Sequence, residues 1–375
     1  MIDFGASSTE ILLNPRLPAA ESERLRRIVD LLPPLTRHVW LTTSGSGGNI
    51  KLVALSKQAI LESADGVNRH LEATAADVWC CPLPLFHVGG LGIVARALRS
   101  GGRALVLDRW TPGAFVDLVR NERITLASLV PAQVRDLIEA GTRAPATLRA
   151  VIVGGGSLSS VAYEQARSLD WPLLPSYGMT ETSSQVATAP LESLERDELP
   201  GLRLLDHLEA REAGGRLAFR GRSLFTAYGS DGDEGPVMTD PKLDGWFVSE
   251  DTGEVKAAAD GVRIVPTGRS ADFLKIGGES VSLGRLDEIL ASVLRSHPGV
   301  DAAVVAVPDA RLGSVIHLAV DQAEAADAIR ASFSDRVLPF ERPRAVHVMP
   351  VPRSPLGKLR RDALLAAVRG STRLT

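Results

Sequence analysis

This sequence has very little cysteine, and the cysteine it has does not form metal-binding pairs. Among 375 residues there are two cysteines, Cys80 and Cys81, and they are direct neighbours. Protein zinc sites usually use cysteines spaced two to four residues apart, so this spacing argues against a zinc centre. The pair lies in the apolar run of residues 78–83, where cysteine packs as a small hydrophobe. We therefore predict a buried strand here and no redox function for the two thiols.

Long apolar runs and a large excess of either charge are also missing. No stretch is long enough to span a bilayer, and residues 1–5 lack the basic-then-apolar order of a secretory signal. The formal net charge is -3 with both signs interspersed, whereas nucleic acids and anionic membranes are bound by concentrated lysine and arginine. We expect a cytoplasmic protein without a nucleic-acid or membrane partner.

What the sequence does contain is a regular alternation of short apolar strands and amphipathic helices over its first half. Apolar residues make up 45% of the chain, enough for more than one core. Such alternation predicts an α/β domain with mainly parallel strands. Strands are predicted at residues 39–41, 78–83, 104–107, 124–130 and 150–153. Helices are predicted at residues 20–32, 56–71, 112–121 and 131–140.

Beyond Pro200 the pattern changes to short strands joined by Gly and Asp turns, which predicts a β-rich subdomain. The last part of the chain mixes helices and strands and has the size of an independent α+β domain. The division is a large N-terminal α/β domain, residues 1–268, and a small C-terminal α+β domain, residues 269–375. The strands expected are residues 216–221, 246–249, 253–255, 302–307 and 316–320, the last two as a hairpin, and the helices are 285–294, 323–332 and 361–368.

Residues 43–51 form a Gly-rich loop with features of a phosphate-binding site. Glycines let backbone N–H groups turn toward an anion, hydroxyl side chains add donors, and Lys51 adds positive charge. A Walker A motif would need Ser or Thr where Leu52 stands, and a dinucleotide fingerprint would need Gly in place of Ile50. A flexible turn between a strand and a helix is the alternative. The candidate phosphate-binding residues are Thr43, Ser44, Gly45, Ser46, Gly47, Gly48 and Lys51.

Residues 176–182 combine an aromatic ring, a glycine and an acid. Tyr177 offers a flat face for a nucleobase, Gly178 allows a ligand close to the backbone, and Thr180 can donate to a phosphate oxygen. Glu181 is a hard oxygen ligand suited to nucleotide-borne Mg²⁺. A polar strand-to-loop junction is the alternative. Three glycines that follow a predicted strand could contact the opposite face of the base that Tyr177 would hold. They are Gly154, Gly155 and Gly156.

Three further charged residues lie next to predicted turns. Asp251 follows an aromatic strand and could accept both hydroxyls of a ribose, to which Arg269 could also donate. Lys358 ends an apolar-flanked loop, where a flexible ammonium can meet a carboxylate and an α-phosphate as negative charge develops. The alternative for Asp251 and Arg269 is that they are solvated charges in turns. The alternative for Lys358 is a surface lysine at the start of the last helix.

Taken together and in this order, these segments resemble the adenylate-forming superfamily of acyl-CoA synthetases, luciferases and peptide-synthetase adenylation domains. The resemblance extends over residues 43–361. Within the superfamily the chain is most similar to the o-succinylbenzoate–CoA ligases of menaquinone biosynthesis. It shares with them a short N-terminal part, an acyl-pocket segment at residues 83–91 and their version of the adenylate motif at residues 176–185.

The resemblance implies a role for each segment. The Gly-rich loop would hold the ATP pyrophosphate, Thr180 would contact the α-phosphate, Glu181 would help to bind Mg²⁺, and Lys358 would drive adenylation. The adenine- and ribose-binding residues would be Gly154, Gly155, Gly156, Ser176, Tyr177, Gly178, Met179, Asp251 and Arg269. For the acid, an apolar slot with polar donors is needed, and the candidates are His87, Ser128, Ser184 and Gln185. A satisfied core histidine is the alternative for His87.

Several positions depart from the superfamily's pattern. Gly47 stands where Thr is usual and Ile50 where Pro is usual, so one hydroxyl contact is missing. Residues 249–251 are Ser-Glu-Asp in place of Thr-Gly-Asp, and the hinge position is Ala271 in place of Asp or Lys. None of these changes removes a charged residue with an assigned role.

The resemblance implies an AMP-forming acid–thiol ligase that uses ATP, Mg²⁺ and coenzyme A. A carboxylate would attack the α-phosphate of ATP, and the thiol of coenzyme A would then attack the acyl-adenylate. The C-terminal domain would rotate about the hinge between the two steps, and a homodimer is a family-level expectation. The alternatives are a CoA ligase for another aryl or medium-chain acid, and a regulatory protein that binds ATP without catalysis.

Overall fold

The computed structural model describes the chain apart from residues 1, 16, 18, 45–49, 157, 270–272, 277, 278, 310, 311, 355, 356 and 371–375. Two units make up the fold, one of Met1–Ser249 with Val255–Val265 and one of Glu250–Glu254 with Pro266–Thr375. The larger unit carries large sheets with helices, and the C-terminal region is a small α+β fold, as predicted. No helix in the described residues is long and apolar enough to cross a membrane.

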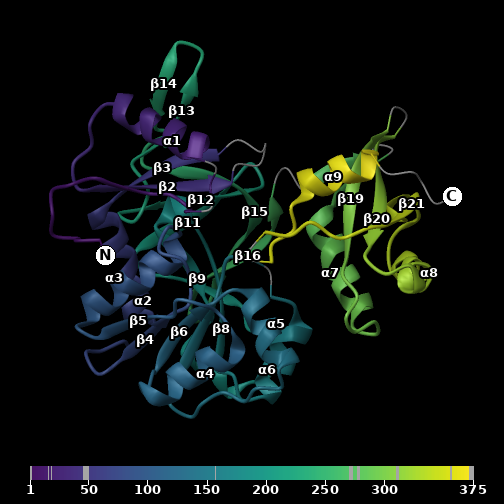
Figure 1. Cartoon of the computed structure of the whole chain (residues 1–375), viewed down its shortest axis with the longest axis horizontal. Helices are drawn as coiled ribbons and strands as arrows, with labels where there is room; N and C mark the ends of the chain where they lie inside the picture. The colour runs from purple at the N-terminus through teal and green to yellow at the C-terminus, as the bar shows by residue number, and fades with distance from the viewer. Residues whose placement is uncertain are drawn as a thin grey trace. The chain divides into compact units, whose positions relative to one another are not determined.

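An eleven-stranded sheet forms the centre of the larger unit, in the order β11-β12-β15-β16-β10-β9-β8-β7-β6-β4-β5 (Figure 1). At one end five strands run parallel, as the alternating pattern predicts. Their bounds are β4 Val78–Cys81, β5 Arg103–Val106, β6 Leu126–Leu129, β7 Ala150–Val153 and β8 Leu173–Met179. Cys80 and Cys81 are both buried with free thiols, and they pack on opposite faces of this sheet.

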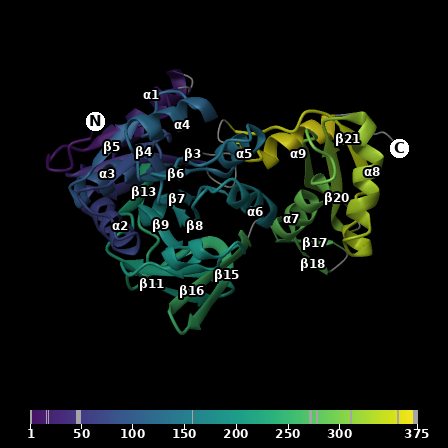
Figure 2. The ribbon, with the colours of Figure 1, turned by 90° about the horizontal axis from the view of Figure 1, so that it is seen from below.

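Helices cover both faces of the parallel strands, which is why these strands are apolar on both sides. One face packs against α2 and α3, and the other against α4, α5 and α6 (Figures 1 and 2). Local signals set the helix starts: the Thr111 hydroxyl accepts from the Ala114 N–H at 3.1 Å, and Pro112 follows at the first helical position. The bounds are α2 Lys57–His70, α3 Val88–Ser100, α4 Pro112–Asn121, α5 Pro131–Glu139 and α6 Ser160–Ser168.

The antiparallel half of the sheet begins where β8 turns into β9. Most of the β-rich region expected after Pro200 extends this same sheet, but β13 and β14 belong to a second sheet. The two short strands expected at residues 246–249 and 253–255 are one strand, β15. The bounds are β9 Ser184–Thr188, β10 Leu202–Leu204, β11 Leu208–Ala213, β12 Arg216–Gly221, β15 Phe247–Ala258 and β16 Gly261–Arg269. Short 3₁₀ turns, η1 Thr180–Thr182 and η2 Leu191–Glu195, flank β9.

A second, five-stranded sheet in the order β1-β2-β3-β13-β14 carries the Gly-rich segment. The alternative interpretation of this segment, a turn between a strand and a helix, was wrong, because the strands β2 and β3, which pair antiparallel, flank residues 45–49. Residues 52–55 explain the difference: all four side chains are buried, so this apolar run packs on both faces as a strand. The bounds are β1 Glu10–Leu12, α1 Ala19–Leu31, β2 His38–Ser44, β3 Ile50–Ser56, β13 Ala227–Gly232 and β14 Gly235–Thr239.

The smaller unit has its own sheet, in the order β18-β17-β20-β19 with β21 beside β20. The predicted hairpin is present as antiparallel β19 and β20. Helices α7 and α8 pack on one face of the sheet and α9 on the other. The bounds are β17 Phe273–Ile276, β18 Glu279–Ser282, α7 Leu283–Leu294, β19 Ala302–Asp309, β20 Gly313–Val320, α8 Ala323–Ser334, η4 Pro339–Glu341, β21 Ala345–Val348 and α9 Arg361–Gly370.

Candidate active site

The Gly-rich segment is presented by the β2–β3 hairpin. Thr43 on β2 lies opposite Lys51 on β3, so the two ends of the predicted phosphate loop are neighbours. Thr43 is half-buried and Lys51 is exposed, with its Nζ 5.4 Å from the centre of the Tyr228 ring. Gly45, Ser46, Gly47 and Gly48, and the side chain of Ser44, lie outside the described residues, so their role as phosphate ligands stays a prediction.

The end of β8 brings two of the predicted nucleotide segments together. The Ser176 hydroxyl donates to the Val153 carbonyl at 3.1 Å, directly before the glycine triplet. A Cβ on Gly154 would lie 2.8 Å from the Ser176 oxygen, which shows how closely the two segments approach. Gly155 and Gly156 are exposed beside them. This arrangement suits the predicted adenine site.

Gly178 is required by the chain's own backbone. It lies at an irregularity in the β8–β9 pairing, and a Cβ there would come within 2.0 Å of the Ser184 carbonyl oxygen. The sequence suggested that this glycine makes room for a ligand, and the close strand supplies a separate reason. Beside it, the Tyr177 ring is half-buried with its centre 6.2 Å from that of Phe219.

Glu181 lies in the 3₁₀ turn after β8, where one residue of β13 and one just before it donate hydrogen bonds to it. The Tyr228 hydroxyl donates to Oε1 of Glu181 at 2.9 Å, and the Phe225 N–H donates to the Glu181 carbonyl at 2.8 Å. Thr180, in the same turn, is half-buried. The turn is closed by Thr182, whose hydroxyl donates to the carbonyls of Met179 and Ser184 at 3.1 and 3.0 Å.

Two of the predicted acid-binding residues, Ser128 and Ser184, share one partner that sequence reasoning missed. Arg96 of α3 donates to the Ser128 hydroxyl at 3.3 Å and to the Ser184 hydroxyl at 3.0 Å. Its side chain is 1% exposed, and its guanidinium carbon lies 5.5 Å from the centre of the Trp79 ring. Burial lowers the pKa of Arg96 to about 10, so the group stays charged at neutral pH.

No carboxylate among the described residues forms an ion pair with Arg96. A buried charge without a counter-ion is costly, and such groups mark places where a charged ligand binds. One signal in the sequence could have revealed this residue: it is the lone charge in the otherwise apolar and small run of residues 88–98.

The other two predicted acid-binding residues lie at the start of α3 and on β9, the elements that carry Arg96 and Ser184. His87 is the residue before α3, it is half-buried, and burial lowers the pKa of its ring, whose centre is 4.6 Å from that of Phe86. Gln185 follows Ser184 on β9, and its Oε1 accepts from the Thr188 hydroxyl at 2.6 Å. Gln185 is therefore engaged within its own strand.

The residues predicted to hold the ribose lie in strands β15 and β16, and the lysine predicted to drive adenylation lies in the smaller unit. Asp251 lies in β15 and Arg269 ends β16, and the hydroxyls of Thr252 and Thr267 are 3.1 Å apart across these neighbouring strands. The Arg269 side chain and Ala271 lie outside the described residues. Lys358 is exposed in the loop before α9, where the Ser354 hydroxyl accepts from its backbone N–H at 3.1 Å.

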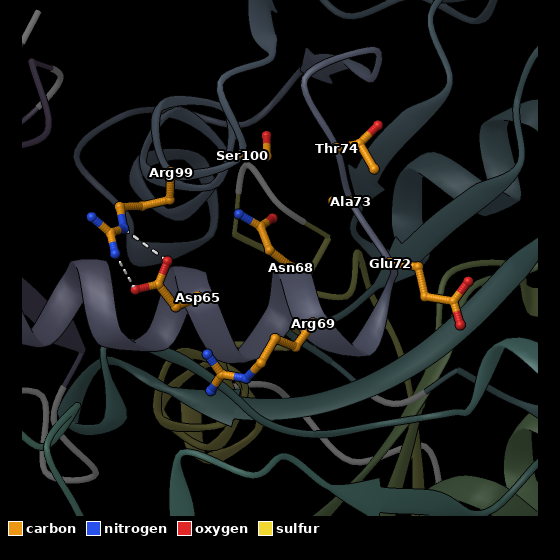
Figure 3. Close-up of a pocket in the computed structure, with 8 residues that line it drawn as sticks. All are labelled: Asp65, Asn68, Arg69, Glu72, Ala73, Thr74, Arg99 and Ser100. Atoms are coloured by element: carbon orange, nitrogen blue, oxygen red, sulfur yellow. Dashed lines mark hydrogen bonds and ion pairs between the residues drawn. The ribbon is translucent and has the colours of Figure 1, made fainter.

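A surface pocket of about 350 Å³ lies elsewhere on the larger unit, between α2 and the end of α3 (Figure 3). Its two arginines are already paired: Arg99 binds Asp65 at 2.6 and 2.7 Å, and Arg69 binds Asp206 at the same two distances. None of the predicted site residues lines it. The lining residues are Asp65, Asn68, Arg69, Glu72, Ala73, Thr74, Arg99 and Ser100.

Known proteins are similar to this chain over most of its length. A 2-succinylbenzoate–CoA ligase from Staphylococcus aureus is 28% identical over 332 residues, which are 86% of this chain and 65% of that protein. The chain therefore spans slightly less than two thirds of the length of this relative.

Two solved structures share the fold. The o-succinylbenzoate–CoA synthetase of Bacillus subtilis in complex with its acyl-adenylate intermediate has a TM-score of 0.76 at 25% identity, covering 89% of this chain and 69% of that one. The same enzyme with ATP and magnesium ion has a TM-score of 0.74 at 25% identity, covering 87% and 69%. The family of AMP-binding enzymes matches residues 9–228, more than half of the sequence, and the chain belongs to this adenylate-forming family.

Proposed function

We propose that this protein activates o-succinylbenzoate with ATP and transfers it to coenzyme A. In the first step a carboxylate oxygen of the acid attacks the α-phosphorus of ATP, pyrophosphate leaves, and an acyl-adenylate forms. In the second step the sulfur of coenzyme A attacks the acyl carbonyl, the thiol loses its proton, and AMP leaves. The products are o-succinylbenzoyl-CoA, AMP and pyrophosphate. Family membership and the similarity to ligases for this acid support the chemistry.

The observation that carries the choice of acid is the buried guanidinium of Arg96. It lies between Ser128 and Ser184, two residues expected to line the acid site, and it is charged at neutral pH. o-Succinylbenzoate has two carboxylates, so one can be activated while the other pairs with Arg96. Benzoate and medium-chain acids have a single carboxylate, and they would leave the arginine without a counter-ion. This favours a dicarboxylic acid over the alternative substrates.

Glu181 is suited to a magnesium ion that arrives with ATP. One of its carboxylate oxygens accepts from Tyr228, and the other has no hydrogen-bond partner among the described residues. Proteins usually hold Mg²⁺ through one or two carboxylates together with substrate phosphates. Within the part of the chain that the structure describes, no three His, Cys, Asp or Glu residues form a metal-binding group. When bound, the ion would neutralise phosphate charge.

The remaining residues would align the reactants. Thr43 and Lys51 would bind phosphate from the two strands of the hairpin, the glycine triplet and Tyr177 would hold adenine, and Asp251 with Arg269 would hold the ribose. Lys358 would bring its ammonium to the reacting groups from a mobile C-terminal domain, residues 269–375, that turns about a hinge at Ala271. Catalysis of the first step would then rest on alignment and charge neutralisation.

The test is pyrophosphate release from MgATP with o-succinylbenzoate, benzoate or octanoate, each with and without coenzyme A. We expect release with o-succinylbenzoate, and a thioester product when coenzyme A is present. A clear preference for benzoate or octanoate would keep the ligase chemistry and contradict the choice of acid. Binding of ATP without release for any acid would favour a regulatory ATP-binding protein.

A further inference from the structure

Residues 223–228 fasten the turn that carries Glu181. The Ser183 hydroxyl donates to the Ser223 carbonyl at 2.7 Å, and the Phe225 N–H donates to the Glu181 carbonyl at 2.8 Å. The third connection reaches the functional group itself, since the Tyr228 hydroxyl donates to Oε1 of Glu181 at 2.9 Å. A phenol bound to a carboxylate is a charge-assisted hydrogen bond, stronger than one between neutral groups.

The same short segment is also fastened to the phosphate-loop hairpin. Tyr228 of β13 lies opposite Val53 of β3, and the Thr226 N–H donates to the Ala54 carbonyl at 2.8 Å. Lys51 is two residues from Val53 on the same strand, so it is the diagonal neighbour of Tyr228, within reach of a large aromatic side chain. Its ammonium lies 5.4 Å from the ring centre, a distance at which cation and ring attract each other.

A single side chain therefore contacts the two groups expected to handle the charge of the triphosphate. Its ring lies under the ammonium of Lys51, and its hydroxyl occupies one oxygen of Glu181. Lys51 lies on β3 of the five-stranded sheet and Glu181 in the turn between β8 and β9 of the eleven-stranded sheet, and Tyr228 connects them directly. The ring is held in place by Phe225, with 4.6 Å between ring centres.

We propose that Tyr228 is a positioning residue for the metal–nucleotide site. Its hydroxyl fixes the carboxylate of Glu181 so that the second oxygen can bind Mg²⁺, and its ring places Lys51 beside the same phosphates. This inference rests on the proposed function, in which Glu181 receives the magnesium ion of MgATP. The residue acts through Glu181 and Lys51 and needs no contact with the reacting atoms.

Tyr228→Phe isolates the hydroxyl, because phenylalanine keeps the ring beside Phe225 and Lys51. The measurement is calorimetric titration of the full chain with ATP in EDTA and with ATP in excess Mg²⁺. We expect the variant to bind MgATP about 10-fold more weakly, the size of effect produced by one hydrogen bond to a charged group, and to bind metal-free ATP as the wild type does. Tyr163→Phe is the matched control, because the buried Tyr163 hydroxyl has no hydrogen-bond partner among the described residues.

A double-mutant cycle with Glu181→Gln separates positioning from a general effect on the fold. If Tyr228 acts through Glu181, adding Tyr228→Phe to Glu181→Gln causes no further loss of MgATP affinity. Equal losses for ATP with and without metal, or additive losses in the cycle, would contradict the proposal while leaving the ligase function intact. Absence of MgATP binding by the wild type would overturn both.

Discussion

The guanidinium of Arg96 on α3 donates a hydrogen bond to the hydroxyl of Ser184 on β9, with 3.0 Å between Nη2 and Oγ. Gly92, one turn earlier on the helix, permits this approach, because a Cβ there would lie 3.1 Å from Nη2 and 3.4 Å from the serine oxygen. Helix and strand thus come together around a buried positive charge. If that charge receives the second carboxylate of the acid, it determines which acids the protein accepts.

Replacing Arg96 should change acid preference. For Arg96→Met we expect kcat/KM for o-succinylbenzoate to fall about 10- to 100-fold, since one hydrogen-bonded charge pair is lost, while that for benzoate changes little. The variant should fold, because an apolar side chain of similar length replaces a buried charge. Arg99→Met is the control, one turn further along α3 and paired with Asp65 at the surface. Equal losses for every acid would contradict a role in acid recognition.

Lys358 should matter for one half-reaction far more than for the other. In Lys358→Ala, adenylation measured as acid-dependent pyrophosphate release should fall at least about 100- to 1000-fold, as when one transition-state donor is removed. Thioester formation from pre-made acyl-adenylate should fall much less. Arg360→Ala, an exposed residue of the same loop, serves as the control. If both steps fell equally, the assigned role would be wrong.

Gly178 should tolerate no side chain. In Gly178→Ala the new methyl group would meet the backbone of Ser184, and we expect a loss of about 1–3 kcal/mol in the free energy of unfolding together with loss of activity. Gly113→Ala is the control, because no atom lies within 4 Å of a Cβ at that helical position. Urea unfolding of both variants checks this; unchanged stability of Gly178→Ala would contradict the requirement for glycine at this position.

Asp77 should make stability depend on acid pH. Burial by itself raises the pKa of this carboxyl, but hydrogen bonds from Arg149, the Thr74 N–H and the Thr125 hydroxyl lower it to about 2. Because the folded pKa lies below the usual value of 3.8, the carboxylate stabilises the fold above about pH 4, and this contribution is lost as the pH falls toward 2.

In Asp77→Asn we therefore expect the free energy of unfolding at pH 7 to fall by about 2 kcal/mol, with a smaller difference from wild type at pH 2.5. Denaturant titrations at the two pH values measure it. Asp170→Asn, which removes an exposed partner of Arg143, should change stability by less than about 1 kcal/mol. A difference independent of pH would show that the charge of Asp77 is not what stabilises the fold.

Local patterns predicted four of the five parallel strands of the large sheet, β4, β5, β6 and β7, because each of these is a short apolar run. The fifth, β8, was not predicted. Helix α4 and strand β7 have the predicted bounds, Pro112–Asn121 and Ala150–Val153. Prediction failed where long-range pairing decides the structure. Residues 52–55 form a strand because both of their faces are buried, and β15 is continuous because its neighbours in the sheet extend it across two predicted strands.

The same limit applies to the candidate site. Glu181 and Ser184 were proposed from the segment at residues 176–185, and Ser128 from the need for polar donors in the acid slot; their roles stay predictions. Arg96 and Tyr228 were missed because their hydrogen-bond partners are far away in the sequence. The two serines bound by Arg96 are 32 and 88 residues from it, and Glu181 is 47 residues from Tyr228. A motif records neighbours in sequence, whereas these two residues act through neighbours in space.

The most direct test of the account is to trap the acyl-adenylate. The protein is incubated with MgATP and o-succinylbenzoate without coenzyme A, and the bound products are identified by mass spectrometry. We predict o-succinylbenzoyl-AMP together with one equivalent of pyrophosphate, and neither product in parallel incubations without the acid. Intact ATP on the protein, with no adenylate from this acid, would contradict the central claim.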